Sequence, residues 1–344
     1  YQESGSIFQT STDSEIVAHL LADPCRRKRA DRFESAMGIL KGAFSFVLMT
    51  ETRLIAARDP QGFRPLCMGR MGDAYVFVSE TCALDILGAK YIRDVEPGEV
   101  ITVDERGMKS TFFANGERHA HCIFEHIYFA RPDSVIFGQN VHMVRMALGR
   151  RLAQDCPVEA DVVIAVPDSG NSSALGFSLE SGIPLDHGYI RNHYIGRTFI
   201  MPTQENRSTG VEIKLNVVKE VVRGKRVVVV DDSIIRGTTS KNRVRLLRQA
   251  GAKEVHLRIS CPPTLHPCYF GIDFPTSAEL IAAGKKDWAE IAAQLGADSL
   301  GYQSIEGMLS CVDKPEGYCT ACFSGNYPVE VEDHMDNKFD MERC

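Results

Sequence analysis

The sequence predicts a mixed α/β and α+β chain, in which a layered unit of strands and helices precedes a domain with a parallel sheet. Residues 227–230 are four consecutive valines, a pattern typical of a central parallel strand that is covered on both faces. Residues 161–166 form a second apolar run, and each run leads into a polar loop and a helical segment. In the first third, short apolar runs instead follow one another with turns between them.

The composition indicates an ordinary globular protein that is large enough for two domains. Of 344 residues, 44% are hydrophobic and 24% are charged, and the net charge of −6 argues against nucleic acid as a partner. We expect no signal peptide, and the sequence shows no run of the roughly 18 apolar residues that a membrane span needs, so we expect a cytoplasmic protein without a membrane partner. Eleven cysteines in such a chain favour metal ligands or reactive thiols over a disulfide framework.

The first domain is expected to cover residues 1–115. Asp13 fits the N-cap of a helix whose apolar residues follow at helical spacing. A second helix is expected at 32–39, and strands are expected at 43–48, 54–57, 75–78 and 100–103. The polar turn at 115–118 predicts the boundary to a second domain that covers residues 116–344.

The second domain is expected to alternate strands and helices. Helices are predicted at 142–153, after residue 239 with Gly251 closing the helix, and at 288–295, and strands at 161–166, 227–230 and 255–259. Residues 191–216 are long, polar and irregular, which is typical of a lid or binding loop.

Polar loops follow both predicted central strands, where ligands bind in open α/β sheets. Asp231 and Asp232 come first after one strand, and hydroxyls and Gly237 then lead into a helix, whose N-terminus suits a phosphate. Residues 167–172 form a similar loop of small polar residues after the other strand. The alternative for each loop is an ordinary turn whose side chains merely cap a helix.

Residues 231–239, Asp-Asp-Ser-Ile-Ile-Arg-Gly-Thr-Thr, resemble the phosphoribosyl pyrophosphate (PRPP) motif of type I phosphoribosyltransferases. The resemblance implies that the acid pair holds the ribose hydroxyls and that the following residues wrap the 5′-phosphate. It implies Mg²⁺ at Ser169, Asp231 and Asp232. The PRPP-binding residues implied are Asp168, Ser169, Gly170, Asn171, Arg197, Lys214, Asp231, Asp232, Ser233, Arg236, Gly237, Thr238 and Thr239.

The first third resembles the later part of the glutaminase domain of amidophosphoribosyltransferases, an N-terminal-nucleophile fold. The matching stretches include Ala-Arg-Asp-Pro at 57–60, Arg-Pro-Leu at 64–66 and Ser-Glu-Thr-Cys-Ala at 79–83. The resemblance implies that Asp13 holds the α-amino group of glutamine. The family's nucleophile is an N-terminal cysteine, whereas this chain begins at Tyr1. We therefore expect a partial glutaminase domain that lacks its catalytic residue.

Four cysteines are candidate metal ligands. By its own sequence context, Cys122 reads as the start of a buried strand, and the Cys-x-x-Cys pair at 319–322 fits half a zinc site, a redox pair or cluster ligands. Residues 122–134 and 318–328 are again similar to the amidophosphoribosyltransferases. The resemblance implies a 4Fe–4S cluster on Cys122, Cys268, Cys319 and Cys322, with zinc at the same thiolates as the alternative.

The implied function is the formation of 5-phosphoribosylamine from PRPP and glutamine-derived ammonia, with release of pyrophosphate and glutamate, which is the first step of de novo purine (IMP) biosynthesis. The implied partners are PRPP, glutamine or ammonia, purine nucleotides as feedback inhibitors, and further copies of the chain in a homo-oligomer such as a tetramer. The alternative is a PRPP-sensing regulator with an inactive phosphoribosyltransferase domain. Such a regulator should carry a DNA-binding module and a basic surface, whereas this chain carries part of a glutaminase domain, four placed cysteines and an acidic balance.

Overall fold

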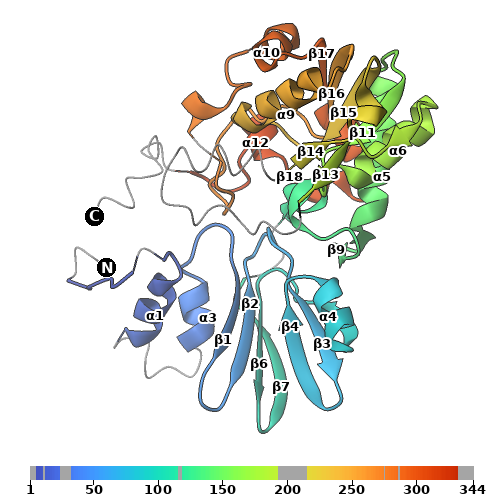
Figure 1. The fold of residues 1–344 in the computed structure, drawn as a ribbon. Coiled ribbons are helices and arrows are strands. Elements are labelled where there is room, and N and C mark those ends of the chain that lie inside the picture. Colours follow the sequence, from blue (N-terminus) through green and yellow to red (C-terminus); the bar gives the residue numbers. More distant parts are fainter. Residues whose placement is uncertain are drawn as a thin grey trace.

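The computed structural model describes residues 5–10, 12–23, 32–114, 118–192, 215–274, 276–285 and 287–331, and Figure 1 shows them in two lobes. The lobe drawn in blue and cyan holds the antiparallel strands of the first domain. The lobe drawn in green to red holds a parallel sheet with helices on both faces. The expected fold class is therefore confirmed. Within the described residues, no helix has both the length and the apolar character that crossing a membrane requires.

The first domain contains two antiparallel sheets. The four-stranded sheet has the order β1-β2-β6-β7 and the three-stranded sheet the order β4-β3-β5. The strands are β1 (Ser45–Met49), β2 (Leu54–Arg58), β3 (Cys67–Met71), β4 (Ala74–Val78), β5 (Lys90–Asp94), β6 (Glu99–Asp104) and β7 (Gly107–Phe112). The strands predicted near β1, β2, β4 and β6 are confirmed, whereas β3, β5 and β7 were not predicted.

Three helices accompany these sheets: α1 (Glu15–Ala22), α3 (Arg32–Met37) and α4 (Thr81–Leu87). Helices α1 and α3 bury Leu20, Phe33 and Met37 against the four-stranded sheet, and they lie beside β1 in Figure 1. The prediction that Asp13 caps α1 is wrong. The cap residue is Ser14, which makes no side-chain capping bond. The carboxylate of the next residue, Glu15, accepts hydrogen bonds from the backbone of Gln9 and Thr10 at 2.8 Å each.

The second domain is organised around a five-stranded sheet with the order β12-β11-β15-β16-β17, in which every pair is parallel. The strands are β11 (Val162–Ala165), β12 (Leu185–Asp186), β15 (Arg226–Asp231), β16 (Glu254–Ile259) and β17 (Ser299–Tyr302). As predicted, the valine run lies in the central strand. The edge strand β17 was not predicted.

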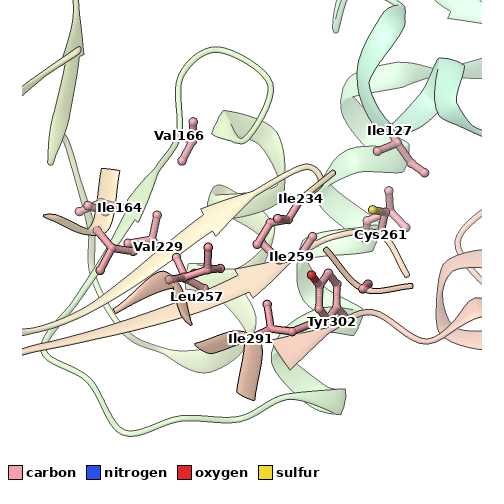
Figure 2. Packing of buried hydrophobic residues seen from close by; sticks show 14 of the residues in the cluster. Ile127, Ile164, Val166, Val229, Ile234, Leu257, Ile259, Cys261, Ile291 and Tyr302 are labelled. Atoms are coloured by element: carbon pink, nitrogen blue, oxygen red, sulfur yellow. The ribbon is translucent and has the colours of Figure 1, made fainter. Parts of the chain in front are cut away.

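The valine run alternates between two apolar layers. Val227 and Val229 belong to a large cluster with residues of α9 (Thr238–Gln249) and α10 (Trp288–Leu295), part of which is seen in Figure 2. Val228 and Val230 belong to a cluster on the opposite face, with residues of α5 (Val141–Asp155) and α6 (Asn171–Ser181). Helices therefore cover both faces, which explains why the strand shows no polar alternation.

Helices α5 and α6 cross with their backbones in close approach. A Cβ atom at Gly149 of α5 would lie 1.9 Å from the carbonyl oxygen of Ser173. A Cβ atom at Gly176 of α6 would lie 2.0 Å from the carbonyl oxygen of Met146. Glycine is therefore required on both helices at this crossing, and the crossing sets the position of α6.

Short elements complete the described structure. A π-helical turn, η1 (Glu125–Phe129), follows β8 (His121–Cys122), which pairs with β18 (Tyr318–Cys319). Strand β13 (Tyr189–Arg191) pairs with β14 (Leu215–Val217), and the predicted loop between them lies mostly outside the described residues. The others are β9 (Val135–Ile136), β10 (Gln139–Asn140), α8 (Lys219–Val222), η3 (Ser277–Glu279), α11 (Ile305–Leu309), η4 (Pro315–Gly317) and α12 (Ala321–Ser324).

Among the described residues, the contacts between the two domains include two groups of hydrogen bonds. In one, the carboxylate of Glu80 in the first domain accepts hydrogen bonds from the backbone N–H of Arg131 at 2.7 Å and from the hydroxyl of Ser134 at 2.8 Å. In the other, residues 61–64 of the first domain pack against β8 and η1. The predicted boundary at residue 115 stays a prediction, since residues 115–117 lie outside the described residues.

Candidate functional site

The candidate site lies where β11 and β15 end. These strands are parallel neighbours in register, with Ala165 opposite Val230, and the N–H of Val166 donates to the carbonyl of Val230 at 2.9 Å. The loops at 167–171 and 231–239 therefore leave the same edge of the sheet side by side. The structure brings together the two loops that are separated by more than fifty residues in the sequence.

The first loop joins β11 to α6 and contains Asp168, Ser169, Gly170 and Asn171. The peptide bond between Pro167 and Asp168 is cis. A Cβ atom at Gly170 would lie 2.6 Å from the carbonyl of Val230, so a larger residue would push this loop away from the second one. Helix α6 begins at Asn171, so the free N–H groups of its first turn point toward this loop.

Asp168 forms an ion pair with Arg191 on β13, and both side chains are at least half exposed. Arg191 was not predicted as a site residue. The position of Arg191 depends on the pairing of β13 with β14, and the sequence does not indicate this pairing.

The acid pair ends β15, and both residues are buried, with Asp231 4% and Asp232 7% exposed. One oxygen of Asp231 accepts the N–H of Asp232 at 3.0 Å, and the other pairs with the guanidinium of Arg243 on α9. The hydroxyl of Ser233 donates to Asp232. Burial raises the pKa of Asp231 to about 7, while the charge of Arg243 acts in the opposite direction. The acid pair is thus held in place before any ligand binds.

Arg243 is a second residue of this site that the sequence did not reveal. Besides pairing with Asp231, it accepts at its backbone carbonyl the hydroxyl of the buried Tyr189, at 2.9 Å. It therefore ties α9 to the end of β15 and to β13. Arg245 and Arg248 lie on the same helix, and nothing in the sequence pattern distinguishes Arg243 from them.

The second loop continues from Ser233 into the N-terminus of α9. Gly237 has a φ of +79° and its Cβ would meet the side chain of Ile281 at 2.4 Å, so only glycine fits. Thr238 and Thr239 begin the helix and are exposed. Free N–H groups and hydroxyls at the start of a 12-residue helix form a site for an anion.

The remaining predicted site residues are Arg236, Arg197, Lys214 and Asp13. Arg236 is exposed and forms an ion pair with Glu279, 2.7 Å from its Nε atom. Arg197 and Lys214 lie outside the described residues. Asp13, the predicted glutamine contact, is exposed at the start of α1.

The four predicted cysteine ligands line one small pocket, together with Phe63 of the first domain. Cys122 and Cys319 lie opposite each other in the parallel pair β8–β18. Burial raises the pKa of the Cys322 thiol well above its usual range and that of Cys319 to about 11. The N–H of Phe270 donates to the sulfur of Cys268 at 3.3 Å.

The donor set of this pocket therefore fits a group that binds thiolates. Clusters of iron and sulfide are held by four cysteines, and N–H bonds to the sulfurs stabilise the ionised form. In the part of the chain that the structure describes, no three His, Cys, Asp or Glu side chains are placed to hold a metal ion.

Comparisons with known proteins agree with this architecture. A model described as a glutamine amidotransferase domain matches residues 1–85, and one described as a phosphoribosyl transferase domain matches residues 145–298. Amidophosphoribosyltransferase of Bacillus subtilis is 51% identical over 335 residues, which are 96% of this chain and 70% of that protein. A chloroplastic amidophosphoribosyltransferase of Glycine max is 52% identical over 96% of this chain and 58% of its own length.

A solved structure of the B. subtilis glutamine PRPP amidotransferase, complexed with ADP and GMP, superposes with a TM-score of 0.87 at 50% identity and covers 97% of this chain and 74% of that one. This chain thus spans only part of the length of these relatives. Because the similarity extends over nearly all of the chain and includes both domains, the protein belongs to the amidophosphoribosyltransferase family of pentosyltransferases.

Proposed function

We propose that this chain binds PRPP with Mg²⁺ between its two strand-end loops and transfers the phosphoribosyl group to ammonia from glutamine, giving 5-phosphoribosylamine at the start of purine biosynthesis. The observation that carries the proposal is the side-by-side placement of the loops at 167–171 and 231–239. PRPP carries a pyrophosphate and a 5′-phosphate on one ribose. A ligand with two anionic ends needs two donor loops at a fixed separation.

The roles proposed for the residues are those that the family resemblance implies. Asp231 and Asp232 accept hydrogen bonds from the ribose hydroxyls, the loop at 168–171 binds the pyrophosphate, and Ser233, Thr238 and Thr239 bind the 5′-phosphate. Arg197, Lys214, Arg236, Gly237 and the N–H groups that begin α9 complete the proposed set. Ammonia is already a nucleophile, so the site positions the ribose C1 and stabilises the leaving pyrophosphate without a strong general base.

The carboxylates of the acid pair fit a hard divalent cation, because Mg²⁺ prefers oxygen ligands and is bound by one or two carboxylates together with substrate phosphates. Ser169, Asp231 and Asp232 would hold it. When bound, Mg²⁺ would supply positive charge to the departing pyrophosphate. Arg243 keeps one oxygen of Asp231 occupied, which leaves Asp232 as the more accessible partner of a ligand.

We further propose a 4Fe–4S cluster on Cys122, Cys268, Cys319 and Cys322. In a cluster each thiolate binds a different iron, so the sulfurs do not have to converge on a single ion as they do around tetrahedral zinc, where each sulfur lies about 2.3 Å from the metal. Metal and sulfide analysis of protein purified without oxygen tests this. Iron and sulfide are expected, and one zinc without iron would refute the cluster.

The remaining assignments rest on the family alone. We propose that Asp13 contributes to the glutamine site, that purine nucleotides inhibit the protein, and that it forms a homo-oligomer such as a tetramer. The structural relative was solved with ADP and GMP, which supports a nucleotide site in that protein. Several relatives are named as chloroplastic, and the cytoplasmic location of this chain stays a prediction.

Calorimetry with PRPP and Mg²⁺ tests the site, and pyrophosphate release in the presence of ammonium tests the reaction. The double variant Asp231→Asn, Asp232→Asn should lose PRPP binding. A control variant, Glu51→Gln with Glu105→Gln, removes the same charge from exposed positions of the first domain and should bind PRPP normally. Unchanged affinity in the acid-pair variant would refute the site. Binding without ammonia-dependent turnover would favour the PRPP-sensing regulator.

A further inference from the structure

Residues 61–64 of the first domain cover the four-cysteine pocket of the second. The N–H of Cys122 donates to the carbonyl of Phe63 at 2.9 Å, and the N–H of Ala120 donates to the carbonyl of Gln61 at 2.9 Å. The ring of Phe63 is fully buried, lines the pocket and stacks on Phe270 with centroids 4.5 Å apart. The pocket is therefore closed by a residue of the other domain.

Arg64 fastens this segment to the second domain by three contacts. Its Nη1 lies 2.5 Å from Oε1 of Glu125, and its Nη2 donates to the carbonyl of Gly271 at 2.9 Å. The guanidinium also stacks over Phe129, 4.7 Å from the ring centroid. Glu125 is 6% exposed, and its carboxylate forms this ion pair with Arg64. Separation of the domains would break the ion pair of this buried carboxylate with Arg64.

Two buried side chains of the first domain form hydrogen bonds with the backbone of residues 61–64. The buried guanidinium of Arg58 donates at 2.8 Å each to the carbonyls of Gly62 and Arg64. The buried carboxylate of Asp59 accepts the N–H groups of Gln61 at 3.0 Å and Phe63 at 3.2 Å. The segment is thus preformed within the first domain and is presented as a rigid unit, so it moves together with that domain.

We propose that residues 61–64 act as a cap, with Phe63 closing the cysteine pocket and Arg64 as the positioning residue that keeps it closed, so that docking of the first domain and binding at the four sulfurs are thermodynamically coupled. Opening the cap exposes the sulfurs. By linkage, a group that binds the sulfurs only in the closed form stabilises the docked arrangement. This inference concerns the chain's own contacts and holds whether iron–sulfur or zinc occupies the pocket.

Pulsed alkylation with iodoacetamide, followed by mass spectrometry of each cysteine, tests the cap. Arg64→Met removes the ion pair and the bond to Gly271 and keeps an unbranched apolar stem at this position. We expect Cys122 and Cys268 to react at least about tenfold faster than in the parent, because reactivity follows the population of the open form. Arg64→Lys keeps the charge near Glu125 but cannot make both bonds in the same geometry, so an intermediate rate is expected.

Two buried cysteines outside the pocket serve as internal references that distinguish opening of the cap from general unfolding. Cys67 is buried in the first domain at 3% exposure and Cys261 in the second at 0%, and neither lies in the pocket. The control Arg70→Met removes an exposed arginine of the first domain whose ion pair is with the neighbouring, exposed Asp73. The cap is refuted if Arg64→Met leaves the reactivity of Cys122 and Cys268 unchanged. It is also refuted if Cys67 and Cys261 accelerate equally, which would show general unfolding.

Hydrogen exchange tests the coupling directly, since the amides of Ala120 and Cys122 donate across the domain interface. Both amides should exchange faster in Arg64→Met. In the parent they should also exchange faster once a chelator has removed bound metal under anaerobic conditions. For a preparation that is isolated without metal, the exchange rates are compared before and after addition of zinc. Zinc should slow the exchange of both amides. Equal exchange rates of these amides with and without metal on the sulfurs would contradict the coupling.

Discussion

Gly149→Ala probes the crossing of α5 and α6, on which the position of the pyrophosphate loop depends. The new methyl group would lie 1.9 Å from the carbonyl oxygen of Ser173 and 2.9 Å from the backbone nitrogen of Phe177. An ordinary contact between a methyl carbon and an oxygen is about 3.5 Å long, so the two helix backbones must move apart by more than about 1 Å. No change of rotamer can relieve the clash, because both partners are backbone atoms.

The expected cost follows from two opposing effects. Alanine in place of a helix-interior glycine stabilises a helix by about 0.5–1 kcal/mol. Overpacking in a tightly packed interior costs about 1–3 kcal/mol or more, and a clash between backbones belongs at the upper end. We therefore expect the second domain to lose about 2 kcal/mol of its free energy of unfolding, which lowers its melting temperature by about 4–8 °C.

Differential scanning calorimetry with and without PRPP measures this effect. Because α6 begins at the loop 168–171, Gly149→Ala should also weaken PRPP binding. Gly38→Ala serves as the control, since its Cβ would meet nothing closer than 3.6 Å. Gly176→Ala clashes at the same crossing, so the double variant should cost less than the sum of the two single variants. A Gly149→Ala protein that melts at or above the parental temperature would refute the reasoning.

Three further predictions concern the acid pair. Asp232→Asn should weaken Mg²⁺-dependent PRPP binding more than Asp186→Asn, an exposed control on β12, by calorimetry. The pKa of Asp231 is raised to about 7, and PRPP binding needs its carboxylate. The affinity for PRPP should therefore fall about tenfold for each pH unit below about 7 and should be constant above this pH. Asp231→Asn should flatten that profile. Arg243→Leu should raise the apparent KM for PRPP, whereas Lys241→Met, which removes an exposed cation from the same helix, should not.

The two strand-end loops and the central strand could be predicted because their signals are local. An unbroken valine run identifies a strand that is covered on both faces, and the polar residues directly after it mark the edge where ligands bind. The bounds of α10 were predicted correctly for the same reason, since Asp287 caps its start and Gly296 follows its end. Residue type and spacing along the chain carry all of this information.

The sequence misled where burial depends on distant partners. His256 and Arg258 alternate with the apolar residues of β16, yet both are buried and bonded, His256 to Ser299 and Arg258 to the carbonyl of Cys156. Asp13 has the residue type of a helix cap, but Glu15 binds the preceding backbone and the helix begins one residue later. Each outcome depends on which partner the fold brings near.

By itself, the sequence determined the family, the order of the two domains and the residues that end the central strands, because these depend on residue type and near neighbours. Only the tertiary structure decided that Arg243 pairs with Asp231, that Arg191 reaches Asp168, and that Phe63 closes the cysteine pocket. Arg64 and Glu125 are separated by 61 positions and meet because two independently built domains dock there. Contacts of this kind depend on the relative placement of whole elements, which local sequence patterns do not encode.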